Sequence, residues 1–228
     1  MWRSKRFFSD RSGDYLFLID EAHNLVDRAR EMYSAVMSMT ELTTARHAVE
    51  DKAVDRRLVT YMDRSILAMS ALRESSEQSC QLMGNIGSLI VYLTKLSEQL
   101  EETLKEGVPA SLREVLMEFY FDIRRFICAF ERSDDRYLIY ALRSEDSFEI
   151  KIFCVDPSKD LGERLAKGCG AVFFSATLFP VQYYKEMLSD TAVSDYDLYV
   201  DSPFCGENRL LVAATDRKQP LYKAGRKS

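Results

Sequence analysis

Tyr15-Leu16-Phe17-Leu18-Ile19-Asp20-Glu21-Ala22-His23 is the stretch of sequence that decides the fold. Five apolar residues in a row, preceded by Gly13 and Asp14, predict a fully buried strand of the kind found in parallel sheets. A similar run, Gly170-Ala171-Val172-Phe173-Phe174-Ser175, predicts a second buried strand. About 150 residues separate the two runs, far more than a βαβ crossover needs. If both strands belong to one parallel sheet, the residues between them form an inserted domain.

The inserted residues carry four apolar stripes at helical spacing, which predict four helices. The stripes run over Leu25–Val36, Leu58–Leu72, Ile86–Leu104 and Leu112–Phe130. Because each stripe occupies one side of its helix, we expect the four to pack as an antiparallel bundle. All five prolines fall after position 108, so the first 108 residues are expected to form long uninterrupted helix.

After the helices the hydrophobic period changes. Arg136–Leu142 and Phe148–Val155 flank a polar turn, and the second run alternates, which predicts a β-hairpin. The other expected elements are a short helix over Leu161–Lys167 capped by Ser158, a helix after Pro180, strands over Leu198–Val200 and Leu210–Ala213, and a polar end from Thr215. The predicted class is α+β, mostly α, with a helical bundle inserted into a partial parallel α/β sheet. The expected boundaries are residues 1–28 and 136–216 for the sheet domain, 29–135 for the insertion and 217–228 for a polar tail.

The composition of the 228 residues excludes several classes of protein. Hydrophobic residues make up 46% and charged residues 29%, values typical of a globular chain and unlike a disordered or collagen-like one. The net charge of −5 argues against a strongly basic protein that coats nucleic acid. The N-terminus lacks the apolar segment of a secretory signal, and no apolar run reaches membrane-spanning length. We therefore expect a cytoplasmic location and no membrane partner.

Cysteine and histidine usage gives no support for a metal site. The five cysteines contain no C-x-x-C pair, which is typical of reduced thiols in a cytosolic chain. They are Cys80, Cys128, Cys154, Cys169 and Cys205. Three of them lie within apolar runs and are expected to be buried. His47 lies in a polar stretch and is expected at the surface or at a helix end.

Asp20, Glu21 and His23 are the candidate catalytic residues. They lie at the carboxyl end of the first strand, the edge where open α/β sheets bind ligands. Asp20 is the candidate ligand for Mg²⁺, since this cation prefers carboxylate oxygens together with nucleotide phosphates. Glu21 can orient or deprotonate the water that attacks a γ-phosphate, and His23 can sense the same side of the nucleotide. The alternative is that Asp20 is an acidic N-cap at the start of a helix.

Two segments together resemble a known family. Asp20-Glu21-Ala22-His23, followed by Asn24-Leu25, resembles motif II, the DEAH box, of the XPD/DinG-like branch of superfamily-two helicases. Phe173-Phe174-Ser175-Ala176-Thr177-Leu178-Phe179-Pro180 resembles motif III of that branch. Cys154–Ser158 and Asp201–Phe204 resemble the segments that flank motif III.

The resemblance implies a segment of an ATP-dependent DNA helicase, with part of a RecA-like motor domain and an Arch-like helical insertion. It implies Mg²⁺ and ATP as cofactors of the complete enzyme and single-stranded DNA as a partner. In that family the motif III segment couples the nucleotide site to DNA, which implies this role for Ser175, Ala176 and Thr177. The alternative for these three residues is a strand-to-helix turn capped by hydroxyls.

Two parts of the family's machinery have no counterpart in the sequence. None of the nine glycines is followed by lysine, so there is no phosphate-binding loop of the Gly-x-x-x-x-Gly-Lys type. Barely 50 residues follow Thr177, too few for a second motor domain. We therefore expect the chain alone to be inactive, with missing helicase halves or another protein as its partner. In that family the iron–sulfur cysteines precede motif II, so no cluster is expected in this segment.

Arginines on the second and fourth predicted helices are candidates for contacts with single-stranded DNA. They are Arg56, Arg57, Arg64, Arg124 and Arg125. Acidic residues interleave with them, so a solvated helix face is the alternative and is favoured over strong binding by the chain alone. The competing hypothesis for the whole chain is a non-enzymatic helical module, derived from a helicase, that binds DNA or protein.

Overall fold

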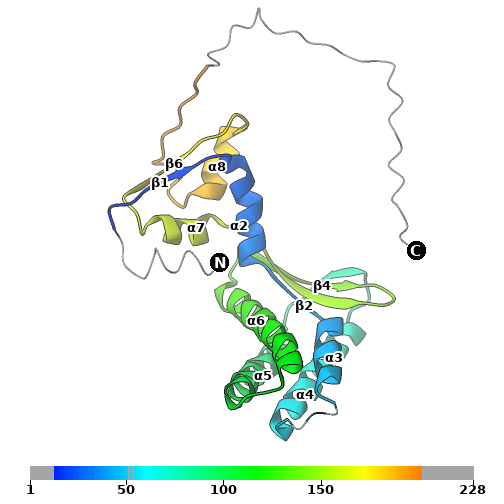
Figure 1. The fold of residues 1–228 in the computed structure, drawn as a ribbon. Coiled ribbons are helices and arrows are strands. Elements are labelled where there is room, and N and C mark those ends of the chain that lie inside the picture. The colour runs from blue at the N-terminus through cyan, green and yellow to red at the C-terminus, as the bar shows by residue number, and fades with distance from the viewer. Residues whose placement is uncertain (1–12, 51, 53, 202–228) are drawn as a thin grey trace, which may run out of the picture. The chain divides into compact units, whose positions relative to one another are not determined.

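The computed structural model describes residues 13–50, 52 and 54–201 (Figure 1). The chain divides into two compact units, Met1–Asp195 and Tyr196–Ser228, and every described helix and strand lies in the first. The helices are the 3₁₀ turn η1 (Ala22–Asn24), α2 (Leu25–Tyr33), α3 (Met39–Ala48), α4 (Arg56–Glu74), α5 (Gly87–Glu106), α6 (Ala110–Arg132), α7 (Ser158–Leu165) and α8 (Val181–Leu188). The strands are β1 (Leu16–Ile19), β2 (Ala35–Ser38), β3 (Cys80–Leu82), β4 (Tyr137–Arg143), β5 (Phe148–Cys154) and β6 (Gly170–Phe173). The predicted α+β, mostly α, class is confirmed.

β1 and β6 pair in parallel, although about 150 residues separate them in sequence (Figure 1). The register aligns Leu16 with Gly170 and Ile19 with Phe173. Both predicted strands therefore exist and lie side by side. The prediction that they are fully buried is wrong, because Leu16 and Leu18 are 60% and 66% exposed. Among the described residues the sheet has only these two strands, and one of its faces is left uncovered.

A second sheet is antiparallel and has the order β2-β5-β4-β3. The predicted hairpin is confirmed as β4 and β5, and residues of β5 alternate between buried and partly buried. β2 and β3 were not predicted, and they interrupt the long helix expected before position 108. Val36 lies in β2, so the first predicted helix is too long by the residues after Tyr33. Strands of four and three residues are too short to produce a clear alternating pattern.

The bundle consists of α3, α4, α5 and α6, and α2 is not part of it. α2 contacts β5 and α8 instead, while α3 packs on α4 and α6. The predicted cores of the other three helices are confirmed in outline: Leu58 and Met62 on α4, Leu93 on α5 and Leu116 on α6 are each 0% exposed. The prediction missed α3 because only Leu42 and Ala45 of this helix are buried, too few to give a visible stripe.

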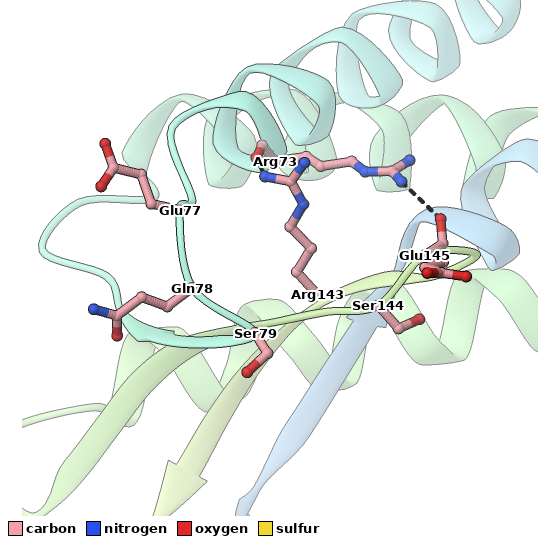
Figure 2. A pocket seen from close by; sticks show the side chains of 7 residues that line it. All are labelled: Arg73, Glu77, Gln78, Ser79, Arg143, Ser144 and Glu145. Carbon is pink, nitrogen blue, oxygen red and sulfur yellow. Dashed lines mark hydrogen bonds between the residues drawn. The ribbon is translucent and has the colours of Figure 1, made fainter.

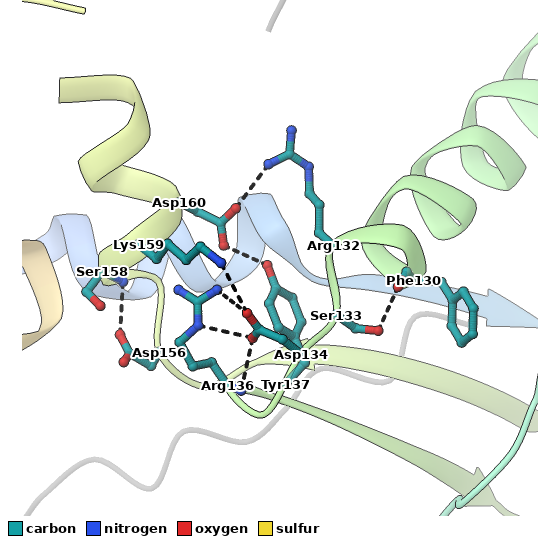
Figure 3. A network of polar contacts seen from close by, with 10 residues as sticks. All are labelled: Phe130, Arg132, Ser133, Asp134, Arg136, Tyr137, Asp156, Ser158, Lys159 and Asp160. Atoms are coloured by element: carbon teal, nitrogen blue, oxygen red, sulfur yellow. Dashed lines mark hydrogen bonds and ion pairs between the residues drawn. The ribbon is translucent and has the colours of Figure 1, made fainter. Parts of the chain in front are cut away.

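A buried polar network joins the insertion to the segments that follow it (Figure 3). Asp160, only 5% exposed, accepts hydrogen bonds from Arg132 Nη1 at 3.0 Å and from the Tyr137 hydroxyl at 2.8 Å. The hydroxyl of Tyr33 donates to the backbone carbonyl of Asp160 at 3.1 Å. Burial, and then the bond to Asp160, raise the pKa of Tyr137 above its usual value. The ends of α2 and α6 and the start of α7 are thereby held at one point.

The predictions for the segments after the hairpin are confirmed only in part. Ser158 is the first residue of α7, not its cap, and its N–H donates to Asp156 Oδ1 at 2.9 Å. Leu198–Val200 does not form a strand, because no partner strand pairs with it among the described residues. Leu210–Ala213 and the polar tail lie outside the described residues. The helix after Pro180 is present as α8.

The cysteine prediction is also corrected. Among the described residues only Cys154 is buried, and burial raises the pKa of its thiol to about 11. Cys80, Cys128 and Cys169 are exposed, because apolar neighbours in sequence do not place a residue on the inner side of its element. His47 lies on the exposed last turn of α3, beside Glu50, as expected. No helix in the described ranges is long and apolar enough to cross a membrane.

Candidate functional site

The candidate site lies at the carboxyl ends of β1 and β6. Backbone pairing continues past both strands, since Phe174 N donates to Ile19 O at 3.0 Å and Ala22 N donates to Phe174 O at 3.2 Å. The two segments that the sequence singled out, Asp20–His23 and Ser175–Thr177, therefore lie next to each other. Parallel pairing is what brings them together, because it places both carboxyl ends at the same edge of the sheet.

Four side chains form one hydrogen-bonded cluster at this edge. His23 Nδ1 lies 2.8 Å from Ser175 Oγ and 3.2 Å from Glu21 Oε2. Ser175 Oγ donates to Glu21 Oε2 at 3.3 Å and accepts from the backbone N–H of Thr177 at 3.2 Å. Thr177 Oγ1 lies 3.3 Å from Ser175 Oγ. Residues from the two predicted motifs, 152 positions apart in the case of His23 and Ser175, are thus in direct contact.

Ser175 Oγ lies at the centre of this cluster. Its hydroxyl donates to Glu21 Oε2, and its oxygen accepts from the backbone N–H of Thr177. The direction of the hydrogen bond between Ser175 Oγ and His23 Nδ1 depends on the tautomer of the imidazole. Ser175 Oγ therefore contacts each of the three other members of the cluster.

Glu21 has an unusual backbone. Its φ of 49° and ψ of 41° lie in the left-handed region, and it is the only non-glycine residue with positive φ in the described part of the chain. This conformation costs about 1–2 kcal/mol for a residue with a Cβ. Asp20 Oδ1 accepts a hydrogen bond from Glu21 N at 2.7 Å, which supports the turn. Among the described residues neither η1 nor α2 has a side-chain cap, so Asp20 is not seen acting as an N-cap.

A small hollow opens beside the two carboxylates. Its volume is about 90 Å³, and its lining consists of Ile19, Asp20, Glu21, Asn24, Leu25 and Arg28. Drug-sized ligands need several hundred Å³, so this hollow can hold only part of a nucleotide. Arg28 is a member that the sequence prediction missed. It lies one helical turn after Asn24 on α2, and that spacing could have identified it.

The donor set at this edge suits Mg²⁺ only together with a nucleotide. Asp20 and Glu21 supply carboxylate oxygens, the ligand type that this cation prefers, with phosphates and water completing its shell. No group of three or more His, Cys, Asp or Glu side chains able to hold a metal by themselves was found among residues 13–50, 52 and 54–201. The carboxylates thus fit Mg²⁺ as a shared ligand of protein and phosphate.

The arginines proposed for nucleic acid lie on the bundle, in two separate groups. Arg56, Arg57 and Arg64 are exposed on α4, and Arg124 and Arg125 are exposed on α6. Arg125 is paired with Asp122 at 3.7 Å. None of the five belongs to the cluster around Ser175.

A larger shallow hollow of about 440 Å³ lies at the end of α4 (Figure 2). It is lined by Arg73, Glu77, Gln78, Ser79, Arg143, Ser144 and Glu145. Arg73 Nη2 donates to the Glu145 carbonyl at 3.1 Å, and Arg143 Nη1 donates to the Arg73 carbonyl at 3.2 Å. Arg143 therefore stabilises the carboxyl end of α4, so this hollow has a structural explanation.

Comparisons with known proteins identify relatives of the chain. No family model matches it. It is 22% identical over 209 residues to ATP-dependent DNA helicase CHL1 of Coccidioides immitis (strain RS), a match that covers 77% of the chain and 24% of that protein. It is also 22% identical over 206 residues to ATP-dependent DNA helicase chl1 of Aspergillus fumigatus, covering 77% of the chain and 26% of that protein.

A solved structure named XPD_APO aligns with 79% of the chain and 38% of its own length, with 14% identity and a TM-score of 0.44. The chain spans about a quarter of the length of the two curated helicases it matches. Both relatives are ATP-dependent DNA helicases, in agreement with the helicase resemblance of the two motifs.

Proposed function

We propose that the chain supplies the motif II and motif III side of a Mg²⁺-dependent ATP hydrolysis site in an ATP-dependent DNA helicase. The observation that carries this proposal is the contact between His23 and Ser175, which joins the two motifs across 152 positions. An acidic turn with only a structural role would not need a histidine and a serine from distant segments at hydrogen-bond distance of its glutamate.

Each side chain has a distinct role in this proposal. Asp20 would hold Mg²⁺ together with the nucleotide, and the bound ion would supply positive charge beside the phosphates. Glu21 orients and deprotonates the attacking water, for which its carboxylate is 63% exposed. His23 transmits the state of Glu21 to Ser175 and Thr177, the coupling residues, and Ala176 lies between them. Rearrangement of these hydrogen bonds on hydrolysis is then communicated to bound DNA.

We further propose the division into a partial RecA-like domain (residues 1–28 and 136–216), an Arch-like insertion (29–135) and a polar tail (217–228). Single-stranded DNA is the proposed substrate of the complete enzyme, and a phosphate-binding loop and second motor domain are supplied by other helicase parts. The chain alone is then inactive. DNA repair is a proposed setting, and the cytoplasm a proposed location.

ATP hydrolysis by the assembled enzyme tests the proposal. The chain is purified alone and also with the polypeptides that bind it in its own cells. We expect no ATP turnover by the chain alone, and turnover by the assembly that Glu21→Gln lowers by about 100-fold or more. Glu31→Gln, the same change at an exposed position of α2, is the matched control and keeps full activity. Ser175→Ala should reduce stimulation by single-stranded DNA more than basal hydrolysis.

Two results would contradict the proposal. An assembly that hydrolyses ATP equally well with Glu21→Gln has its catalytic base elsewhere. An assembly that binds the chain firmly but never hydrolyses ATP favours the alternative, a non-enzymatic interaction module.

A further inference from the structure

Four side chains on the outer face of the bundle form two crossed cation–π pairs. The guanidinium of Arg64 on α4 lies 5.9 Å from the ring centroid of Tyr92 on α5. In the opposite sense, Lys95 Nζ of α5 lies 5.8 Å from the ring centroid of Tyr61 on α4. The members on each helix are three positions apart, so the pairs are neighbours along the α4–α5 seam. They hold two large aromatic side chains in a fixed arrangement at the surface.

Two exposed aliphatic side chains extend this seam. Leu67 follows Arg64 by one helical turn and is 70% exposed, and Val91 precedes Tyr92 and is 52% exposed. The inner side of the same two helices is filled by fully buried residues such as Leu58 and Leu93. Leu67 and Val91 therefore contribute nothing to the core of the bundle. We name the set Tyr61, Arg64, Leu67, Val91, Tyr92 and Lys95 the α4–α5 patch.

The cations of the patch are not neutralised by carboxylates. Across the described ranges, neither Arg64 nor Lys95 has an ion pair with Asp or Glu. Asp63, the nearest acid in sequence to Arg64, is held by Arg46 at 2.7 Å. The cations therefore keep N–H groups that a partner's carboxylates can use.

We propose that the α4–α5 patch binds an acidic segment of a partner protein, with apolar side chains of that segment contacting Leu67 and Val91. Tyrosine and arginine are the residue types enriched at the energetic centres of protein interfaces, and here both are combined with exposed aliphatic groups. The positive charges of Arg64 and Lys95 select acidic partners. The patch shares no residue with the candidate hydrolysis site, so this inference goes beyond the proposed function.

Single-stranded nucleic acid fits the same patch less well. Bases bind to such surfaces by stacking on open aromatic faces. Each tyrosine of the patch already has a cation over its ring, and two aliphatic side chains offer little to a phosphate backbone. We therefore assign Arg64 to the proposed protein-binding patch in place of a nucleic-acid site, and Arg56, Arg57, Arg124 and Arg125 stay as nucleic-acid candidates.

A peptide titration tests this inference with the full 228-residue chain. The probe is a fluorescein-labelled 18-residue peptide that carries Glu and Asp with leucines at helical spacing. Two variants of the probe replace its leucines by serine or its acids by lysine, and a labelled 20-nucleotide oligothymidine is the second ligand. We expect the acidic leucine peptide to bind, and both peptide variants to bind at least 10-fold more weakly.

Charge reversal locates the binding. The double variant Arg64→Glu and Lys95→Glu should weaken peptide binding at least 10-fold, and Leu67→Ser at least 3-fold. Arg113→Glu, an exposed charge reversal on α6, is the matched control and should leave binding unchanged. Circular dichroism and thermal unfolding of every variant verify that it is folded.

Three results would overturn the inference. The first is no binding of the acidic leucine peptide at millimolar concentration. The second is peptide binding that the double variant leaves unchanged. The third is binding of the oligothymidine, lost in the double variant, with no binding of the peptide, which would assign the patch to nucleic acid.

Discussion

The parallel pair β1–β6 and the helical bundle differ sharply in how they are packed. Leu93, Leu96 and Leu100 on α5 are 0% exposed, whereas Leu16 and Leu18 on β1 are more than half exposed. The bundle buries one side of every helix, while the parallel pair has one covered face and one open face. A two-stranded sheet is at best marginally stable by itself. The candidate catalytic residues therefore lie beside the parallel pair, which buries fewer apolar side chains than the bundle does.

The bundle provides most of the buried core, whereas the parallel pair positions the candidate catalytic residues. The cluster of Glu21, His23 and Ser175 is positioned by two strand ends, and α2 connects it to the network at Asp160 beside the bundle. Among the described residues nothing covers the exposed side chains of Leu16 and Leu18, whereas the apolar sides of the bundle helices are covered by one another. Substitutions in the two regions should thus have opposite consequences for stability and for chemistry.

The largest expected effect is the loss of core packing in the bundle. Leu93→Ala removes a fully buried side chain and should lower the free energy of unfolding by about 2–5 kcal/mol. Leu18→Ala makes the same chemical change at a position that is 66% exposed and should alter it by about 0.5 kcal/mol or less. Urea unfolding followed by circular dichroism measures both. Equal losses for the two variants would mean that the open face of β1 is covered in the folded chain.

The comparison also explains how much the sequence could predict. The long stripes of α4, α5 and α6 indicated these helices correctly, because a helix buried on one side repeats its apolar positions over many turns. The continuous apolar runs at Leu16–Ile19 and Gly170–Phe173 indicated the two strands, and the spacing between them indicated the insertion. The pairing of these strands then brought Ser175 to His23, as the two motifs implied.

The misses have a common physical cause. The missed elements are β2, β3 and α3, which are short. Their burial depends on partners far along the chain, such as Ile152, which pairs with Ala35 of β2. The local pattern of apolar residues does not indicate such partners. The patch residue Tyr92 was missed for the same reason, since its partner Arg64 lies on another helix. Arg28 differs, because its helical spacing from Asn24 could have identified it. The exposure of Leu18 was missed because a continuous apolar run is typical of a strand covered on both faces, and the described chain covers only one.

An intermediate effect is expected at the edge of the bundle, where the Arg136 guanidinium and backbone hold the pKa of Asp134 at about 2, below its usual 3.8 (Figure 3). A carboxyl whose pKa is lowered by folding stabilises the folded state above its unfolded pKa. That contribution disappears as the pH falls from about 4 to about 2. Because the side chain is 35% exposed, solvent screening reduces the contribution to about 1 kcal/mol.

Asp134→Asn should therefore lower the free energy of unfolding above pH 4 by about 1 kcal/mol, and the difference from the parent chain should vanish near pH 2. Asp146→Asn, an exposed acid on the turn between β4 and β5 for which no ion pair is seen in the described residues, is the control and should show no such trend. Denaturant unfolding at several pH values measures both variants. A constant difference at every pH would show that the ion pair is not its cause.

The smallest expected effect lies in the parallel pair and has the opposite sign. Glu21 occupies a left-handed backbone conformation, and its carboxylate is the proposed catalytic base. Glycine adopts this conformation without the cost of about 1–2 kcal/mol that a Cβ incurs, but loses about 0.5–1 kcal/mol more conformational entropy on folding. Glu21→Gly should therefore be more stable than Glu21→Ala by about 0.5 kcal/mol, although both lack the carboxylate and both should abolish ATP hydrolysis by the assembly. A glycine variant clearly less stable than the alanine variant would show that any strain at φ of 49° is smaller than the entropic cost of glycine. A more stable glycine variant would mean that the backbone at Glu21 is strained, a local cost in the parallel pair that the folded chain has to offset elsewhere.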